Sequence, residues 1–514
     1  MFVKTELTTL LAWLLIVVST PAQSVELPDG FVDEVYISGL TGLPTGFEQS
    51  ADGWMFISEK SGIVRVARDG VLLEKPFLDI NEIVNDYVDR GLLSIAVHPQ
   101  FPATPYVYVL YTYDPPELLT NGHTGYGLPD GEGNRVGRLV RYTANAERGF
   151  NEALLASARI ILGSNSNYEA IGEPEGQYDT LTPSCGAIDA PMRDCLPVDE
   201  LSHTIGAVRF ASDGTLLVSN GDGASYHNIV DMTVMAHDVN SMRGKILRID
   251  PETGDGLPDN PFYDNTDPGS NQSKVLSSGL RNPYSMTVHP LTGVPYVGDV
   301  GWHEWEEING GTGRDFGWPC YSGSPGNNSR HPDFEDLEYC QTLYDSGEQY
   351  TPPLLGWRQN QDGAASMVGD FYFGETFPSH YTGMLFYGDF VQGWIHYASV
   401  NNPAKVVSYD FASGLLPMTE IRTGQDGSLY YASITTGEIR RIRFEADTTS
   451  TTDSAIENND SVGDSSGVNS EVDGTTDVDT ESDGVIRVGA VSPLWLVSLL
   501  LFGLYTRRRL FAAH

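Results

Sequence analysis

The feature that most constrains the fold is an internal repeat in which a turn containing Asp-Gly or Thr-Gly leads into one apolar strand and then a second. Clear copies are ADGWMFISEKSGIVRVARDG (51–70), ASDGTLLVSNGD (211–222), HPLTGVPYVGDVG (289–301) and GQDGSLYYASITTGEIRRI (424–442), and looser copies lie at 98–113 and 377–399. Short alternating runs between such turns indicate β-strands. Six units predict an all-β, six-bladed β-propeller of four-stranded antiparallel blades. The alternatives are a β-helix and a β-sandwich, but a sandwich would not repeat its turn chemistry.

The N-terminal residues 1–24 have the pattern of a secretory signal peptide. A lysine precedes an apolar run from Leu10 to Val18, and small residues follow at Ala22 and Ser24. Such a segment is removed on export and takes no part in the fold. We therefore expect the propeller to occupy residues 25–445 of an exported protein.

Behind the propeller the composition changes to Thr, Ser, Asp, Asn, Glu and Gly, which predicts a disordered acidic linker over residues 446–487. Residues 488–506 are apolar and, at about 1.5 Å per residue, just long enough to span a bilayer core. Three arginines open the basic tail of residues 507–514, which should stay on the cytoplasmic side. This order resembles the C-terminal sorting signals of bacterial envelope proteins. We expect a periplasmic or cell-surface protein anchored to the membrane by this segment.

The overall charge bears on the class of partner. The chain carries 69 acidic and 30 basic residues, a formal net charge of -39. Nucleic-acid binding needs clustered Lys and Arg that neutralise phosphates. The composition therefore argues against a nucleic-acid partner and favours cations, neutral substrates or plain solubility.

The four cysteines of an exported chain are expected to form disulfides, because their number is even and the compartment is oxidising. Proximity in the sequence favours Cys185 with Cys195 and Cys320 with Cys340, each bond stapling a long loop. A zinc site is the alternative, but no CxxC pair supports it.

Polar groups lie beside glycines at predicted strand ends in four places. These are Asp89-Arg90-Gly91-Leu92-Leu93, His203 with Asp222, Gly279-Leu280-Arg281-Asn282-Pro283, and Gly298-Asp299-Val300-Gly301-Trp302 running on to Glu306-Glu307. A hairpin from His203 to Asp222 would bring this pair into one pocket. A histidine suits a general base because its unperturbed pKa lies near neutrality. The alternative for a single histidine is a structural role in a strand turn.

These stretches, together with RGLLSIAVHPQF, GKILRIDP, GRDFGWP and FPSHYTGMLFYGDF, resemble the soluble quinoprotein glucose and sorbosone dehydrogenase family. That family includes the aldose dehydrogenases that use pyrroloquinoline quinone (PQQ). The order and spacing of the motifs over most of the body carry the resemblance. It implies an enzyme, dependent on PQQ and calcium, that oxidises the hydroxyl of an aldose or related sugar and passes hydride to the quinone.

The resemblance also implies roles for single residues. His203 takes the place of the catalytic histidine and Asp222 that of the acidic residue beside it. Arg281 and Asn282 match a pair at the quinone, where the arginine can stabilise negative charge. Asp89 and Arg90, which stand where glucose-oxidising members have a glutamine, are assigned to the cofactor site.

For the metal, the resemblance implies that the carbonyl groups of Gly301 and Trp302 bind the catalytic calcium, a hard cation that can polarise the quinone carbonyl. Glu306 and Glu307 correspond to an acidic stretch near a second, structural calcium. A solvated pair of surface carboxylates is the alternative for these two glutamates.

The chain departs from the glucose-oxidising members in several places, and Gly301-Trp302 stands where they have the calcium-binding Gly-Pro. The segment from Gly363 to Tyr372 holds no basic residue, so the later cofactor-binding lysine and arginines of the family have no counterpart there. The motif Asp89-Arg90-Gly91-Leu92-Leu93-Ser94, with Tyr387-Gly388-Asp389-Phe390, is closer to a branch that includes hedgehog-interacting-protein-like domains. The alternatives to a dehydrogenase are a non-catalytic propeller that binds a carbohydrate or protein at the cell envelope, and a calcium-dependent lactonase-type hydrolase.

Overall fold

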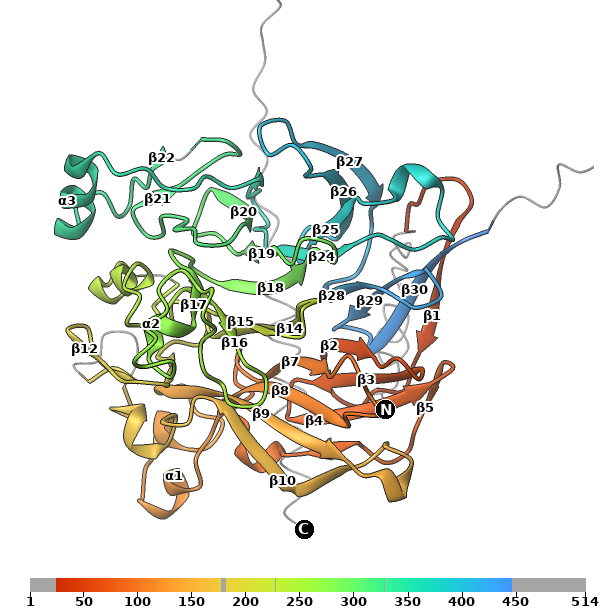
Figure 1. Cartoon of the computed structure of the whole chain (residues 1–514), viewed down its shortest axis with the longest axis horizontal. Coiled ribbons are helices and arrows are strands. Elements are labelled where there is room, and N and C mark those ends of the chain that lie inside the picture. The colour runs from red at the N-terminus through yellow and green to blue at the C-terminus, as the bar shows by residue number, and fades with distance from the viewer. Residues whose placement is uncertain (1–24, 177–181, 227, 328, 446–514) are drawn as a thin grey trace, which may run out of the picture. The chain divides into compact units, whose positions relative to one another are not determined.

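The structure, a computed structural model, describes residues 25–176, 182–226, 228–327 and 329–445. In these residues six antiparallel sheets are arranged in a ring (Figure 1). Their first strands are β2 (Pro44–Gln49), β7 (Leu92–Val97), β14 (Ile205–Phe210), β18 (Pro283–Val288), β24 (Ser366–Phe371) and β28 (Met418–Thr423). Each first strand contacts the next one, and β28 contacts β2, so these strands line the centre of a closed ring. The prediction of a six-bladed β-propeller is confirmed.

The first three blades, numbered in chain order, continue outward from β2, β7 and β14. Blade 1 adds β3 (Trp54–Glu59), β4 (Ile63–Arg68), β5 (Val71–Leu72) and β6 (Leu78–Asp79); blade 2 adds β8 (Tyr106–Tyr113), β9 (Arg135–Ala144), β10 (Ala153–Leu162) and β13 (Leu196–Val198); blade 3 adds β15 (Leu216–Asn220), β16 (Lys245–Ile249) and β17 (Val275–Ser277). Blades 1 and 2 thus each carry one strand beyond the expected four, because β6 also pairs with β4 and β13 with β9.

The other three blades continue from β18, β24 and β28. Blade 4 adds β19 (Pro295–Asp299), β20 (Trp305–Gly310) and β23 (Leu355–Arg358); blade 5 adds β25 (Leu385–Asp389), β26 (Trp394–Ser399) and β27 (Val407–Ala412); blade 6 adds β29 (Leu429–Ser433), β30 (Glu438–Phe444) and β1 (Phe31–Ile37). Outside the blades lie two small hairpins and three short α-helices: β11 (Gly186–Ala187) with β12 (Ala190–Pro191), β21 (Tyr321–Ser322) with β22 (Ser329–Arg330), α1 (Glu117–Thr120), α2 (Asn271–Lys274) and α3 (Glu338–Ser346). Each blade contains one of the six copies of the sequence repeat.

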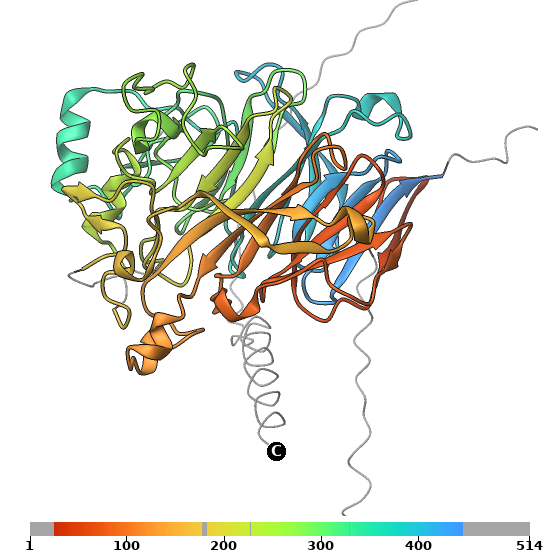
Figure 2. The same ribbon diagram turned by 60° about the horizontal axis from the view of Figure 1, so that its bottom comes forward.

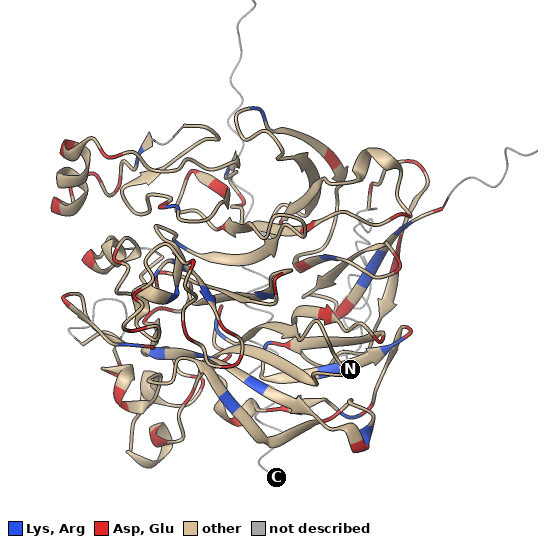
Figure 3. Ribbon diagram, in the orientation of Figure 1, with Lys and Arg blue, Asp and Glu red and all other residues tan. Residues whose placement is uncertain are grey.

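The ring is closed by pairing the N-terminal strand with the last one. β1 runs antiparallel to β30, so blade 6 combines both ends of the propeller. Asp33 pairs with Arg440 at 2.7 Å, and Glu34 accepts hydrogen bonds from Arg441 and Arg443; the arginines are the blue stretch of β30 in Figure 3. β1 lies outside the repeat, so the repeat alone did not indicate which strand would complete blade 6.

The core lies between neighbouring blades rather than inside one sheet. On β3, Phe56 packs against Phe77 and Phe101 on the side of blade 2, whereas Met55 and Ile57 pack against blade 6. Successive side chains of a strand point to opposite faces, so a strand between two neighbours must be apolar on both. This requirement explains the continuous apolar runs in the repeat.

The segments predicted at the two ends of the chain, residues 1–24, 446–487, 488–506 and 507–514, lie outside the described residues. No helix in the part that the structure describes is long and apolar enough to cross a membrane. The signal peptide, the membrane segment and the envelope location stay predictions.

Both predicted disulfides are present, Cys185 with Cys195 and Cys320 with Cys340. The second joins the residue directly before β21 to α3, which lies at the periphery of the ring in both views (Figures 1 and 2). Its sulfur atoms pack in one cluster with Trp302, Trp318 and Phe334, which we call the aromatic cover. The Cys320–Cys340 disulfide is therefore part of the packed side chains around Trp318.

We expect the double variant Cys320→Ser/Cys340→Ser to lose about 3 kcal/mol of unfolding free energy, measured by urea denaturation, because the unfolded chain regains loop freedom. Cys185→Ser/Cys195→Ser is the control, with a similar expected loss. The near-ultraviolet circular dichroism of the buried tryptophans should change only in the first variant, which loosens the aromatic cover. Equal spectra for both variants would contradict this assignment.

Candidate active site

His203 lies two residues before β14, at the end of the propeller centre where that strand begins. Its φ angle is +52°, in the left-handed region, and its side chain is buried, with 2% of the residue exposed. Such a backbone costs a non-glycine residue about 1–3 kcal/mol and persists only where surrounding contacts hold it. The contacts around His203 therefore hold it in a backbone conformation that lowers the stability of the fold.

Asp222 and Trp318 orient the His203 ring. Nδ1 of His203 lies 3.0 Å from Oδ1 of Asp222, and the Trp318 indole N–H donates to Oδ2 at 2.8 Å. Because a carboxylate only accepts, Nδ1 carries the proton and Nε2 keeps its lone pair. Nε2 is hydrogen-bonded to none of the described residues. This arrangement leaves a proton acceptor free on the far side of the ring.

The surroundings keep His203 neutral at physiological pH. Burial and the nearby Arg281 charge lower its pKa to about 4, although Asp222 acts in the opposite direction. Burial raises the pKa of Asp222, but the hydrogen bonds from His203 and from the Ala224 N–H outweigh this effect and hold the pKa below its ordinary value. The pair at pH 7 is therefore a carboxylate beside a neutral imidazole.

Gly221 is required for the close approach of these two residues. A Cβ atom at this position would lie 2.2 Å from the carbonyl oxygen of His203. The N–H of Gly221 donates to Thr204, and that of Gly223 to His203. The Gly-Asp-Gly sequence thus lets Asp222 lie beside the backbone of His203.

Asp299, which the sequence analysis did not select as a site residue, fixes the Arg281-Asn282 turn. Its two carboxylate oxygens accept from the N–H groups of Arg281, at 3.1 Å, and Asn282, at 2.6 Å. The carbonyl of Arg281 in turn accepts from the N–H of Asp222 at 2.8 Å. His203, Asp222, Arg281 and Asn282 are therefore brought together as predicted.

A repeated sequence signal could have identified Asp299. Gly-Asp follows or ends the second strand in three successive blades, at Gly221-Asp222, Gly298-Asp299 and Gly388-Asp389. Each of the three aspartates accepts a hydrogen bond from a backbone N–H: Asp222 from Ala224, Asp299 from Arg281 and Asp389 from Val391. Burial raises the pKa of Asp299 to about 8, with a contribution from the Glu307 charge.

Two buried donors near His203 lack an acceptor. Nη1 of Arg281 donates to the carbonyls of Val300 and Gly301, at 2.7 and 2.8 Å, but its Nε is unpaired among the described residues, as is Nε1 of Trp302. The guanidinium carbon lies 5.2 Å from the Trp302 ring centre. Unpaired buried donors are costly. They are the chemistry expected where a ligand rich in carboxylate and carbonyl oxygens binds.

The predicted calcium ligand at the Gly301 carbonyl does not fit a cation, and the Trp302 carbonyl stays a prediction. The Gly301 carbonyl is hydrogen-bonded to the Arg281 guanidinium, a positive group that would repel calcium there. Glu306 accepts from the N–H groups of Gly301 and Ser366, and Glu307 from that of Gly323. Burial raises the pKa of Glu306 to about 7. Among the described residues there is no group of three or more His, Cys, Asp or Glu that could hold a metal.

Arg90 has structural contacts instead of the predicted contact to a cofactor. Its guanidinium is fully buried and donates to the backbone carbonyls of Gly131, Glu132, Gly133 and Glu200. Asp89 is exposed, and its N–H donates to the Leu201 carbonyl. These contacts hold the segment that leads into His203.

Comparison with known proteins agrees with this geometry. The model of a family described as glucose/sorbosone dehydrogenase matches residues 42–155 and 194–441. An uncharacterized protein of Synechocystis is 24% identical over 427 residues, 80% of this chain and 87% of its own length. Human Hedgehog-interacting protein is 26% identical over 277 residues, 51% of this chain but 32% of that protein.

Solved structures share the fold. The apo-form of the soluble aldose sugar dehydrogenase of Escherichia coli superposes with a TM-score of 0.55 at 19% identity, covering 80% of this chain and 99% of the other. The PQQ-bound form of an aldose sugar dehydrogenase of Streptomyces coelicolor gives 0.50 at 16% identity, covering 82% and 99%. With the family model matching well over half of its residues, the chain belongs to the glucose/sorbosone dehydrogenase family.

Proposed function

We propose that the chain is a PQQ-dependent dehydrogenase that oxidises a hydroxyl group of an aldose or related sugar. The observation that carries the proposal is the free Nε2 of a neutral, fixed His203 next to the unpaired donors of Arg281 and Trp302. Membership of the family supports the reaction class. The PQQ-bound form of the Streptomyces protein supports the choice of cofactor.

Each residue has a defined task in this reaction. Nε2 of His203 takes the proton of the sugar hydroxyl, and the Asp222 carboxylate then stabilises the imidazolium. Trp318 holds Asp222 in place. PQQ, when bound, supplies the electrophilic quinone that accepts hydride from the sugar carbon. Arg281, Asn282 and the Trp302 N–H would hold the carboxylate and quinone oxygens of the cofactor.

A direct test uses the full-length chain, PQQ and a panel of aldoses, with reduction of an artificial electron acceptor as the readout. Aldose-dependent reduction that requires PQQ is the expected result. Addition and chelation of calcium form a second arm. Because the Gly301 carbonyl is bonded to Arg281, we expect chelation to leave turnover unchanged.

The pH dependence of kcat/KM should reflect the lowered pKa of His203. The imidazole acts as a base only when unprotonated, so activity falls as the pH drops through that pKa; the acid limb is expected near pH 4 instead of about 6.5 for an unperturbed histidine. Asp222→Asn removes a charge that raises this pKa, so the limb should move lower while kcat falls. A limb between pH 6 and 7, or one unchanged in the variant, would contradict the assignment of His203 as the base.

Asp299→Ala should weaken PQQ binding about 10- to 100-fold in a fluorescence titration, because two hydrogen bonds that fix the Arg281-Asn282 backbone are lost. Asp389→Ala is the matched control. Asp389 is equally buried at the same position of blade 5 and accepts from Ala365 and Val391. The control variant should lose stability but keep its affinity for PQQ, and equal weakening in both would argue against the role of Asp299.

A second candidate is a non-catalytic propeller that binds a carbohydrate or a protein. The observation in its favour is the burial of the site, since only 8% of Trp302 and 5% of Trp318 are exposed above His203. The similarity to Hedgehog-interacting protein agrees with it. Failure of the full-length chain to bind PQQ would favour this candidate over the dehydrogenase.

A further inference from the structure

A cavity of about 730 Å³ opens at the end of the central channel opposite His203. It is lined by residues where the first strands end, among them Glu48 and Ser50 at β2, Arg209 at β14 and Arg422 at β28. His203 precedes the other end of β14, about 20 Å away at about 3.3 Å per residue. The cavity is therefore separate from the candidate active site, and its size is typical of small-ligand sites.

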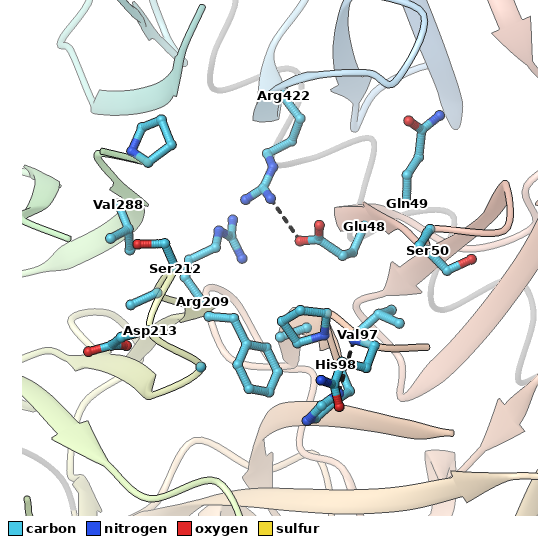
Figure 4. A pocket seen from close by; sticks show the side chains of 18 of the residues that line it. Glu48, Gln49, Ser50, Val97, His98, Arg209, Ser212, Asp213, Val288 and Arg422 are labelled. Carbon is cyan, nitrogen blue, oxygen red and sulfur yellow. Dashed lines mark hydrogen bonds and ion pairs between the residues drawn. The ribbon is translucent and has the colours of Figure 1, made fainter. Parts of the chain in front are cut away.

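Each charged group named in and around this cavity is paired with one of opposite charge. Arg209 lies 2.6 Å from both carboxylate oxygens of Glu420, and Arg422 pairs with Glu48 at 2.8 Å and with Asp370 at 3.4 Å. Figure 4 shows Arg209, Arg422 and Glu48 pointing toward one another from three different blades. Because each guanidinium is already paired with a carboxylate, an anionic ligand would find no unpaired positive charge in the cavity. A cation would be repelled by both arginines, so this pairing favours a neutral ligand.

The cavity also has unused hydrogen-bonding capacity of both kinds. Oε1 of Glu48 is an acceptor with no bond to any described residue. Nδ1 of His98 accepts from the Gln100 N–H, so its proton is on Nε2, which likewise has no bond to the described residues. A hydroxyl group, which donates and accepts, matches this mixture.

The cavity lining also includes apolar groups. The rings of Phe210 and His98 lie 5.3 Å apart at 69°, and Val97, Val288 and Pro290 also line the cavity. An aromatic ring beside polar groups suits a ring compound that has C–H groups on its faces and hydroxyls around its edge.

We propose that this cavity binds a neutral saccharide or related cyclic polyol at a site separate from His203. Glu48 and His98 bond its hydroxyls, and Phe210 packs against its ring. The proposal does not depend on PQQ binding or on dehydrogenase activity.

The test is isothermal titration of the full-length chain, without PQQ, with D-glucose and with cellobiose. We expect saturable binding of at least one of them, weakened tenfold or more in Glu48→Ala and in Ser212→Trp. Ser212 is an exposed turn residue on the cavity wall, so the added indole fills the cavity with little risk to folding. Thr435→Trp, in the exposed turn between β29 and β30, is the matched control and should bind as wild type.

His203→Asn separates this site from the candidate active site. Binding that persists in His203→Asn and is lost in Ser212→Trp supports the proposal, whereas the reverse pattern assigns the saccharide to the His203 site and overturns it. No saccharide binding by the folded wild type also overturns it. So does saturable binding of inorganic phosphate that is lost in Ser212→Trp.

Discussion

Replacing His203 by Asn is expected to lower kcat on the order of 1,000-fold, because the sugar hydroxyl loses its proton acceptor. Asparagine is chosen because it tolerates the left-handed backbone at this position and its amide can still donate to Asp222. Affinity for PQQ should change little, so the loss should appear in turnover, measured by acceptor reduction at saturating cofactor.

His303→Ala is the control for His203→Asn. His303 is exposed on the neighbouring segment, pairs with Asp333 and lies against the outer side of the site at Trp302, with no hydrogen bond to Asp222 or Arg281. Its removal should leave kcat near that of the wild type. Retained turnover in His203→Asn would reject His203 as the base.

Replacing Glu420 by Leu should lower the free energy of unfolding by about 3–5 kcal/mol, because the buried Arg209 guanidinium loses its partner. The two side chains are 5% and 8% exposed and join blades 3 and 6. The measurement is urea denaturation. The double variant Arg209→Met/Glu420→Leu should recover most of the loss, since it leaves no unpaired charge.

Asp267→Leu provides the comparison at the surface. It breaks the exposed pair with Arg193, whose side chains are 52% and 40% exposed. Exposed pairs contribute about 0–1 kcal/mol. A loss at Glu420 no larger than that at Asp267, or a double variant as unstable as Glu420→Leu, would contradict the account of the buried pair.

The fold was predictable because each blade carries its own copy of one local signal. A turn with Asp-Gly or Thr-Gly followed by apolar strands needs no knowledge of distant contacts. The closure by β1 was not predictable in this way, because its partner β30 lies at the other end of the propeller and the match depends on Asp33 and Glu34 meeting three arginines.

The site was predictable where its residues stand at strand ends. His203 and Asp222 flank one hairpin, and the start of β18 brings Arg281 to the same place. Trp318 comes from a loop 96 residues after Asp222. Nothing in the local sequence indicates that its indole N–H donates to Asp222 and so completes the hydrogen-bonded series with His203. Arg90 was assigned to the cofactor because the sequence motif reveals a charged residue there. The motif does not reveal the four backbone carbonyl groups that accept hydrogen bonds from Arg90 in the fold. The cavity opposite His203 arises from five strand ends that no single motif joins.

The role of His203 with PQQ is tested by titrating the full-length chain with PQQ, followed by one addition of the aldose that proves active. We expect saturable quenching of tryptophan fluorescence, because Trp302 and Trp318 both lie close to Arg281. We also expect loss of the oxidised quinone absorbance when the aldose is added, in the wild type but not in His203→Asn. A chain that is folded but binds no PQQ, or bound quinone that the aldose reduces equally fast in both proteins, would contradict this role.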